Sequence, residues 1–328
     1  MKKPLACILL LLISALCLSG CASTSREQEL MKAEIERQAK MESRWLPPDE
    51  EKQNKNLPPM TAAQYERKGD FYAAHGERDE ALVCYREALA HEPGRPGALY
   101  KAGAMELQKG MFAAAACEFK KALENNSDAA RKFHPASLEG MGVICLARGQ
   151  LDKAKGFLIA AGKLDPSMWG AMDLLGIIYD RQKRYSRARG EFEAAIGLNP
   201  SSGALFNNLG MSYLLAGDYE KARKAFAEAL KLEKGRPGEK RVYGNMGLAF
   251  AKAGRYRRAF AMFEKAGARA RALNNLGYVS MMGGKYAMAI SAFRKAMQAD
   301  PAWYGLAHQN LKRALRLSSR EQVEGGQK

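Results

Sequence analysis

The sequence predicts an all-α fold, a solenoid of about seven helix-turn-helix repeats that is closed by a C-terminal capping helix. The stretch from Gly203 to Leu232 indicates two antiparallel helices, because large apolar residues recur three and four positions apart on each half. Small residues stand at positions 8, 20 and 27 of this unit, where the two helices must approach closely. So short a hairpin cannot bury its apolar faces by itself, and it therefore needs neighbouring copies.

The same spacing of small residues recurs along the chain. Proline, which cannot continue a helix, follows the second helix in four of the units. The units start near residues 62, 96, 135, 169, 203, 240 and 270, and together they are predicted to span residues 61–301.

This pattern resembles the tetratricopeptide repeat (TPR) family, whose period is about 34 residues. The resemblance implies that the helix pairs wind into a right-handed superhelix. It also implies that the first helix of each repeat lines a concave groove, chiefly through positions 2, 5, 6, 9, 12 and 13. In repeats four to seven these positions are rich in apolar and amide side chains. The predicted partner-binding residues are Ile177, Asn207, Asn208, Met211, Leu214, Leu215, Asn245, Leu248, Asn274, Asn275 and Tyr278.

Three asparagines share position 6 of consecutive repeats, namely Asn208, Asn245 and Asn275. An amide carries both donor and acceptor groups, so a row of amides can pair with the backbone of an extended peptide. The alternative is that asparagine at this position is an ordinary feature of such repeats.

The N-terminus predicts export followed by lipidation. Residues 1–20 combine a basic start with a short apolar run, as a secretory signal peptide does. The residues Leu18-Ser19-Gly20-Cys21 resemble the lipobox of bacterial lipoproteins, which implies that Cys21 is acylated and becomes the new N-terminus. By resemblance to Gram-negative lipoproteins, the absence of aspartate after the cysteine implies the outer membrane, facing the periplasm. A soluble exported protein and an uncleaved anchor are the alternatives.

Two segments flank the repeats. Residues 21–60 are charged and hold two proline pairs, so they predict a solvated tether, or else a docking segment at Trp45-Leu46. Residues 302–318 are amphipathic and predict the capping helix, whereas residues 319–328 are polar and predict a disordered tail.

Two irregular repeats and three cysteines leave alternatives open. Residues 125–134 are an insertion that lengthens a helix or opens a loop, and the sixth repeat is clipped to a short second helix or a tight turn. A bridge between Cys84 and Cys117 is conceivable in an oxidising compartment. Plain packing of these two thiols and of Cys145 is favoured, because buried thiols behave as small apolar groups.

Composition and motifs favour binding over catalysis. The formal net charge of +17 indicates by default a generally basic, soluble surface, and it also suits anionic lipid head groups, lipopolysaccharide or an acidic protein partner. Nucleic acid is discounted, because an exported lipoprotein rarely meets it. The four histidines lack the spacing of metal ligands, and Gly156 to Lys163 departs from a phosphate-binding loop in its spacing. We therefore expect no enzyme activity, no metal, no small-molecule substrate and no cofactor besides the acyl lipid at Cys21.

Within the TPR family, the chain resembles the TPR lipoproteins of Flp-type (Tad, tight adherence) pilus loci. The resemblance rests on residues 206–230, 243–266 and 272–297 and on the closing helix at 303–315, and the lipobox at Cys21 agrees with it. It implies a scaffold that helps the outer-membrane secretin ring to reach its site or to assemble. The alternatives are an adaptor for periplasmic cell-wall enzymes, a pilotin-like protein of type IV pili, and a weak unrecognised enzyme activity.

Overall fold

The computed structural model describes residues 59–300 and 304–325 of the 328-residue chain. The predicted signal peptide, the lipidation site Cys21 and the tether up to residue 58 lie outside these residues. Within the described part the chain is all-α, as predicted, with sixteen helices and no strand. The chain divides between Ala171 and Met172 into two compact units.

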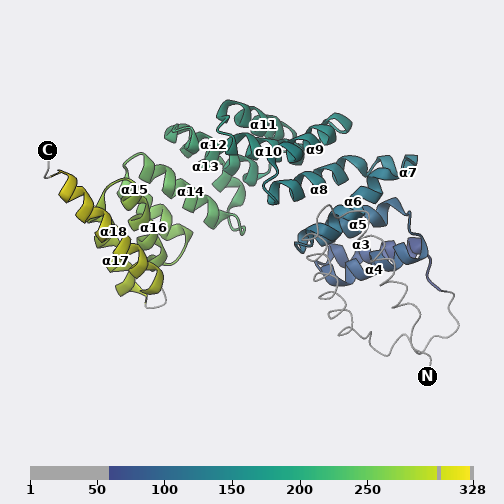
Figure 1. Cartoon of the computed structure of the whole chain (residues 1–328), viewed down its shortest axis with the longest axis horizontal. Helices are drawn as coiled ribbons and strands as arrows, with labels where there is room; N and C mark the ends of the chain where they lie inside the picture. Colours follow the sequence, from purple (N-terminus) through teal and green to yellow (C-terminus); the bar gives the residue numbers. More distant parts are fainter. Residues whose placement is uncertain (1–58, 301–303, 326–328) are drawn as a thin grey trace, which may run out of the picture. The chain divides into compact units, whose positions relative to one another are not determined.

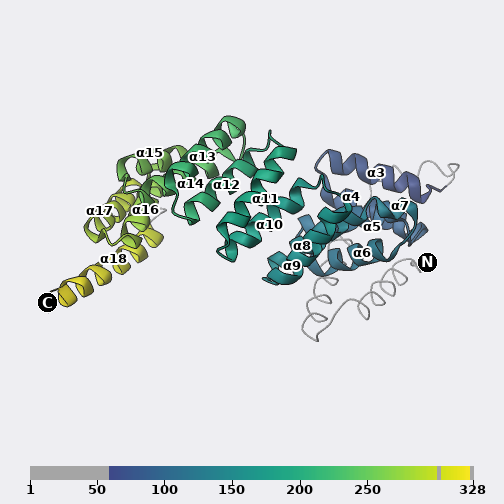
Figure 2. The same ribbon diagram turned by 90° about the horizontal axis from the view of Figure 1, so that it is seen from above.

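The first unit contains three helix pairs and one short helix. The two helices of each pair contact each other, and each pair contacts the next one (Figure 1; Figure 2). Neighbours in sequence are therefore neighbours in space. The helices are α3 (Ala62–Ala74), α4 (Arg78–His91), α5 (Pro96–Gln108), α6 (Phe112–Glu124), α7 (Asp128–Arg131), α8 (His134–Ala147) and α9 (Leu151–Leu164).

The second unit repeats this arrangement. Contacts join α12 to α13, α14 to α15 and α16 to α17, and the last helix, α18, contacts both α17 and α16. The helices are α10 (Trp169–Arg181), which begins just before the boundary, α11 (Tyr185–Leu198), α12 (Gly203–Leu215), α13 (Tyr219–Glu233), α14 (Glu239–Lys252), α15 (Tyr256–Ala266), α16 (Arg269–Met282), α17 (Tyr286–Ala299) and α18 (Tyr304–Gly325).

Each helix pair is built around a glycine that faces a large side chain. A Cβ added to Gly210 would lie 2.6 Å from Cε1 of Phe226, whose side chain is fully buried, and Ala222 beside it is fully buried as well. The predicted close approach at the small residues is thus confirmed. The equivalent contacts are Gly69–Tyr85, Gly103–Phe119, Gly142–Leu158, Gly176–Phe192, Gly247–Phe263 and Gly277–Phe293.

The turn within each repeat uses a residue with positive φ at position 15. Gly217 shows the pattern: its N–H donates to the Leu214 carbonyl oxygen at 3.1 Å, and the N–H of Asp218 donates to that of Tyr213 at 2.9 Å. Six repeats have glycine here, with φ between 70° and 85°. The fourth repeat has Lys183 instead, with φ 58°, and no other non-glycine residue in the described part has a positive φ.

The two irregular repeats differ from the others in local ways. The insertion after α6 adds the one-turn helix α7, which starts where the Ser127 hydroxyl accepts the N–H of Ala130 at 3.3 Å. The ring of Phe133, just after this helix, stacks on Tyr100 with centroids 5.5 Å apart. The clipped sixth repeat keeps a second helix, α15, which has 11 residues.

The C-terminal helix α18 covers the last repeat. Ala307, Leu311 and Ala314 are buried against residues of α16 and α17. The helix continues to Gly325, so the disordered tail expected from residue 319 instead begins as helix. No proline or glycine interrupts the chain between Leu306 and Glu324, and arginine, glutamate and glutamine are good helix formers.

The three cysteines of the repeats are packed as small apolar side chains. Cys84, Cys117 and Cys145 are all buried, and none of them forms a disulfide with another described residue. Burial raises the pKa of the Cys84 and Cys145 thiols. The conceivable bridge between Cys84 and Cys117 is not formed.

Candidate functional site

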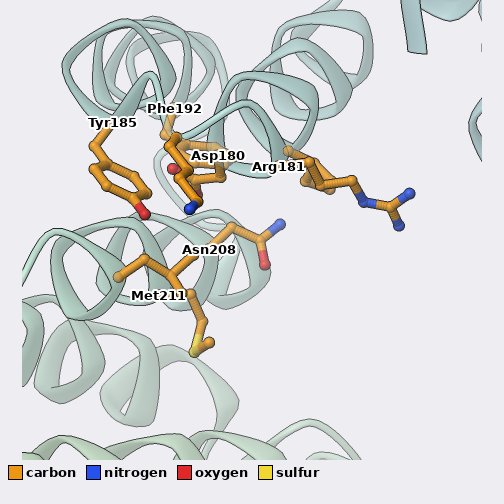
Figure 3. A pocket seen from close by; sticks show the side chains of 9 residues that line it. Asp180, Arg181, Tyr185, Phe192, Asn208 and Met211 are labelled. Carbon is orange, nitrogen blue, oxygen red and sulfur yellow. The ribbon is translucent and has the colours of Figure 1, made fainter.

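The second unit carries an open hollow of about 400 Å³ between α10, α11 and α12 (Figure 3). Four of the eleven predicted partner-binding residues lie in it. They are Ile177, Asn208, Met211 and Leu215. The hollow is also lined by Asp180, Arg181, Lys183, Tyr185 and Phe192.

The apolar residues of the hollow pack against the core on one side and are exposed to solvent on the other. Ile177 is half-buried and packs against the core cluster around Phe192, while Met211 is half-buried against the core cluster around Phe226. Leu215 is the last residue of α12, and 51% of its surface is exposed. Apolar surface is therefore presented to solvent on a base that the core holds in place.

Two polar residues that line the hollow, Asp180 and Asn208, already have hydrogen-bond partners within the second unit. The Ser212 hydroxyl donates to Asp180 at 2.7 Å, and the Asn208 amide donates to Asp173 at 2.8 Å. Burial raises the pKa of both carboxyls, and the two hydrogen bonds offset part of that rise. In Figure 3 the guanidinium of Arg181 extends away from Asp180, toward solvent.

Two of the three asparagines in the predicted row, Asn208 and Asn245, instead donate hydrogen bonds to the helix of the preceding repeat. Asn207 is only 4% exposed and accepts a bond from Asn245 at 2.8 Å, which joins α14 to α12. Asn274 is 5% exposed and accepts a bond from Asn310 of α18 at 3.0 Å. Asn275 is half-buried and has no hydrogen bond to another described side chain. Asn207 and Asn274 thus differ from the prediction, because their amides are enclosed between helices.

Three other predicted residues also lie outside the hollow. Leu214 is 7% exposed and belongs to the core around Phe226, so it is not groove surface. Leu248 is half-buried against the same core. Tyr278 of α16 is 44% exposed. The side chain at position 12 of this repeat points toward the core, so the prediction that Leu214 lines the groove is wrong.

The corresponding positions of the first unit are occupied by ion pairs. Lys101 donates to Glu66 at 2.8 Å and to Asp70 at 2.7 Å, and Arg95 also donates to Glu66. The Tyr85 hydroxyl donates to Asp70 at 2.9 Å. Burial opposes ionisation of Glu66, but the bonds from Lys101 and Arg95 outweigh it and hold the pKa of Glu66 below its usual value. Here the side chains satisfy one another.

No three His, Cys, Asp or Glu side chains in residues 59–300 and 304–325 are grouped so as to hold a metal ion. None of the helices in that part of the chain combines the length and the apolarity that a membrane crossing requires.

Sequence reasoning missed five of the residues that line the hollow, which come from the end of α10, the following turn and α11. One signal was present in the sequence. Lys183 stands at position 15, where the other six repeats have glycine.

Sequence comparison identifies the repeat. Three family models, each described as a tetratricopeptide repeat, match this chain. They cover residues 67–130 and 140–203, residues 201–271, and residues 270–303, which together exceed half of the chain. No curated protein matches the sequence significantly.

Solved structures agree on the fold. One is a tetratricopeptide repeat protein from Parabacteroides merdae, with 17% identity, a TM-score of 0.55, and coverage of 77% of this chain and 98% of that one. The Cut9–Hcn1 hetero-tetramer of the APC/C gives 19% identity and a TM-score of 0.59, over 81% of this chain and 50% of that one. The C-terminal part of a TPR repeat-containing protein from Cytophaga hutchinsonii has 19% identity and a TM-score of 0.51, with coverage of 75% of this chain and 98% of that one.

Proposed function

This chain belongs to the tetratricopeptide repeat family, whose repeat arrays are scaffolds for protein–protein interaction, and from this premise we propose that it is a non-enzymatic, lipid-anchored scaffold. It binds a segment of a protein partner in the hollow between α10, α11 and α12. The finer proposal is that the partner is the outer-membrane secretin, or another component, of a Flp/Tad-type pilus.

The observation that carries the binding proposal is the apolar surface in the hollow. Ile177, Met211 and Leu215 contribute apolar atoms to one open concavity of about 400 Å³. A concave apolar site with a few polar groups at fixed positions is the usual form of a binding site. The flexible thioether of Met211 lets such a surface adapt to the shape of its partner.

The proposed location rests on the N-terminal sequence. Cys21 follows a lipobox-like Leu18-Ser19-Gly20, and two or three acyl chains at that cysteine would each bury many methylenes at about 0.8 kcal/mol apiece. The lipid would hold the scaffold at the outer membrane while the repeats bind the partner in the periplasm. The pilus assignment is supported by the resemblance of the last three repeats to the TPR lipoproteins of Tad loci.

The test is co-purification from detergent-solubilised membranes with two matched variants. Leu215→Gln removes exposed apolar surface inside the hollow. Leu198→Gln makes the same change at the last residue of α11, where the leucine is 46% exposed but does not line the hollow. The expected result is recovery of the secretin with the wild type and with Leu198→Gln. Recovery with Leu215→Gln should fall about tenfold, since burying half a leucine on binding is worth about 1 to 1.5 kcal/mol.

Three results would each overturn part of the proposal. Equal recovery of the secretin with Leu215→Gln would place its binding outside the hollow. Recovery of cell-wall enzymes without a secretin would replace the pilus role by the adaptor role. A Cys21→Ser protein that remains in the outer membrane would remove the lipid anchor from the proposal.

A further inference from the structure

The left-handed residue of the fourth repeat is an anomaly among the seven repeats. Position 15 is glycine with φ between 70° and 85° in six of them, and it is Lys183 with φ 58° in the fourth. Its hydrogen bonds are the usual ones of this turn, because the N–H of Lys183 donates to the Asp180 carbonyl oxygen at 2.9 Å and that of Arg184 donates to the Tyr179 carbonyl oxygen at 2.8 Å. The turn therefore forms in the same way whether lysine or glycine occupies the position.

The turn does not need the lysine side chain. A Cβ added to Gly217, its counterpart in the next repeat, would meet nothing within 4 Å, so a side chain at this position projects into open space. A residue with a Cβ pays a steric penalty in the left-handed region that glycine avoids. Non-glycine residues in this conformation recur at binding sites, where the side chain has a role of its own.

Two observations indicate the role of Lys183, namely its place in the hollow and the lack of a salt bridge to any described residue. It lines the hollow together with Arg181, both side chains are exposed, and neither forms a salt bridge with any described residue. Two cations of the first unit are paired instead: Lys101 bonds to Glu66 and Asp70, and Arg86 bonds to Glu106 on another helix at 2.8 Å.

The hollow has an excess of positive charge. Its one lining carboxylate, Asp180, accepts the Ser212 hydroxyl bond, and it is outnumbered by Arg181 and Lys183. Ile177, Met211 and Leu215 contribute apolar surface to the same hollow that these two cations line. The site is therefore complementary to a chain segment that carries an apolar side chain next to an acidic one.

We infer that Lys183 is a specificity-determining residue of the hollow, where it holds an aspartate or glutamate side chain of the bound segment beside an apolar anchor. This inference rests on the proposed binding function and names the chemistry of the segment. The lysine is retained in an unfavourable backbone conformation because glycine would leave the acidic side chain without its cation.

The experiment uses the full chain in detergent and random peptides displayed on phage. Peptides that bind the wild type are synthesised in pairs, one with its acidic residues and one with those residues changed to Asn or Gln. Each pair is titrated against the wild type, Lys183→Gly, Leu215→Gln and Lys295→Ala. Lys295 is an exposed residue of α17 outside the hollow, so its replacement controls for the loss of one positive charge.

The expected result is a set of peptides that depend on Leu215 and contain an acidic residue. Loss of the peptide's acidic residue or of Lys183 should weaken binding up to about fivefold at low salt, the effect of one exposed charge pair. The two losses should not add, and high salt should remove the difference. Lys295→Ala should bind like the wild type. Lys183→Gly should also raise the thermal unfolding midpoint by about 1 to 4 °C, and Gly217→Lys should lower it.

The failures can be told apart. Peptides that depend on Leu215 but have no acidic preference, or whose preference survives in Lys183→Gly, would overturn the assignment of Lys183 and leave the binding function standing. An absence of any peptide that depends on Leu215 would overturn the hollow as a binding site, and this inference with it. A Gly217→Lys protein as stable as the wild type would refute the argument from backbone strain.

Discussion

Replacing Asn245 by leucine tests whether the asparagines of the first helices are structural. Asn245 donates to the side-chain oxygen of Asn207 at 2.8 Å, and Asn207 is only 4% exposed. In Asn245→Leu this oxygen loses its donor, while the leucine keeps water away from it. A buried polar atom left without its partner costs about 1–3 kcal/mol. The better helix propensity of leucine returns up to about 0.5 kcal/mol. We therefore expect a net loss of about 0.5–2.5 kcal/mol.

Urea unfolding followed by far-UV circular dichroism measures this loss. The unfolding midpoint of the second unit is compared between the variant and the wild type, and the comparison holds when the two proteins have equal m-values. The matched control is Asn275→Leu, which makes the same change at position 6 of the last repeat, where the asparagine has no hydrogen bond to a described side chain. This control should stay within about 0.5 kcal/mol of the wild type. A double variant with Asn207 and Asn245 both changed to leucine should lose less than the sum of its parts, because both polar groups are then gone.

Equal losses for Asn245→Leu and Asn275→Leu would refute the assignment of the Asn207–Asn245 bond as a link between repeats. The outcome also bears on function. A triple replacement of the position-6 asparagines would lower stability as well as any peptide binding, so binding to such a variant is informative only after its folding has been measured.

The same Gly→Ala change should have opposite effects at two helical positions. At Gly210 a Cβ would lie 2.6 Å from Phe226, so Gly210→Ala should lose about 1–2 kcal/mol of stability to overpacking. At Gly190 nothing lies within 4 Å of such a Cβ, so Gly190→Ala should gain up to about 1 kcal/mol from better helix propensity. Urea midpoints of the two variants that move in the same direction would contradict this. Burial raises the pKa of Asp173 above 3.8, so the native state binds this proton more tightly and stability falls as pH rises from that value to the raised pKa. Asp173→Asn should remove this part of the pH dependence, and an unchanged slope of the urea midpoint against pH would show that the carboxyl is not destabilising. The pH dependence expected from Glu66 has the opposite sign. Its pKa lies below 4.5, so its contribution to stability is present above pH 4.5 and is lost as pH falls through the lowered pKa. Glu66→Gln should therefore be less stable than the wild type at neutral pH, and a stability difference that does not shrink in acid would argue against the ion pairs.

The arrangement of helices could be predicted because it depends on the size of a few side chains. Gly210 and Ala222 allow two helices to approach closely, and the buried ring of Phe226 fills the space beside them. Large and small residues recur with a regular period in the sequence, so the helix pairs could be located from the sequence alone. The extension of α18 to Gly325 was missed, because polar residues were interpreted as disorder although they are also good helix formers.

The candidate site could be predicted only in part. Position in the repeat placed Ile177, Met211 and Leu215 on the correct helices, and these three side chains meet in the hollow. It also placed Leu214 there, although that side chain turns into the core. One step along a helix rotates a side chain by about 100°, so neighbouring residues at the edge of a groove have different surroundings.

The sequence by itself determined that this protein is an array of helix pairs, because the spacing of large and small residues along each helix is a local property that recurs in every repeat, and six of the seven repeats also have a glycine at the turn. Only the tertiary structure decided which side chains remain available to a partner. The Asn245 amide is bound to Asn207, the Glu66 carboxylate is bound to Lys101, and Lys183 has no salt-bridge partner among the described residues. Pairing of this kind depends on atoms that lie about one repeat apart along the chain and within 3 Å in space, and a repeat pattern contains no information about such distances.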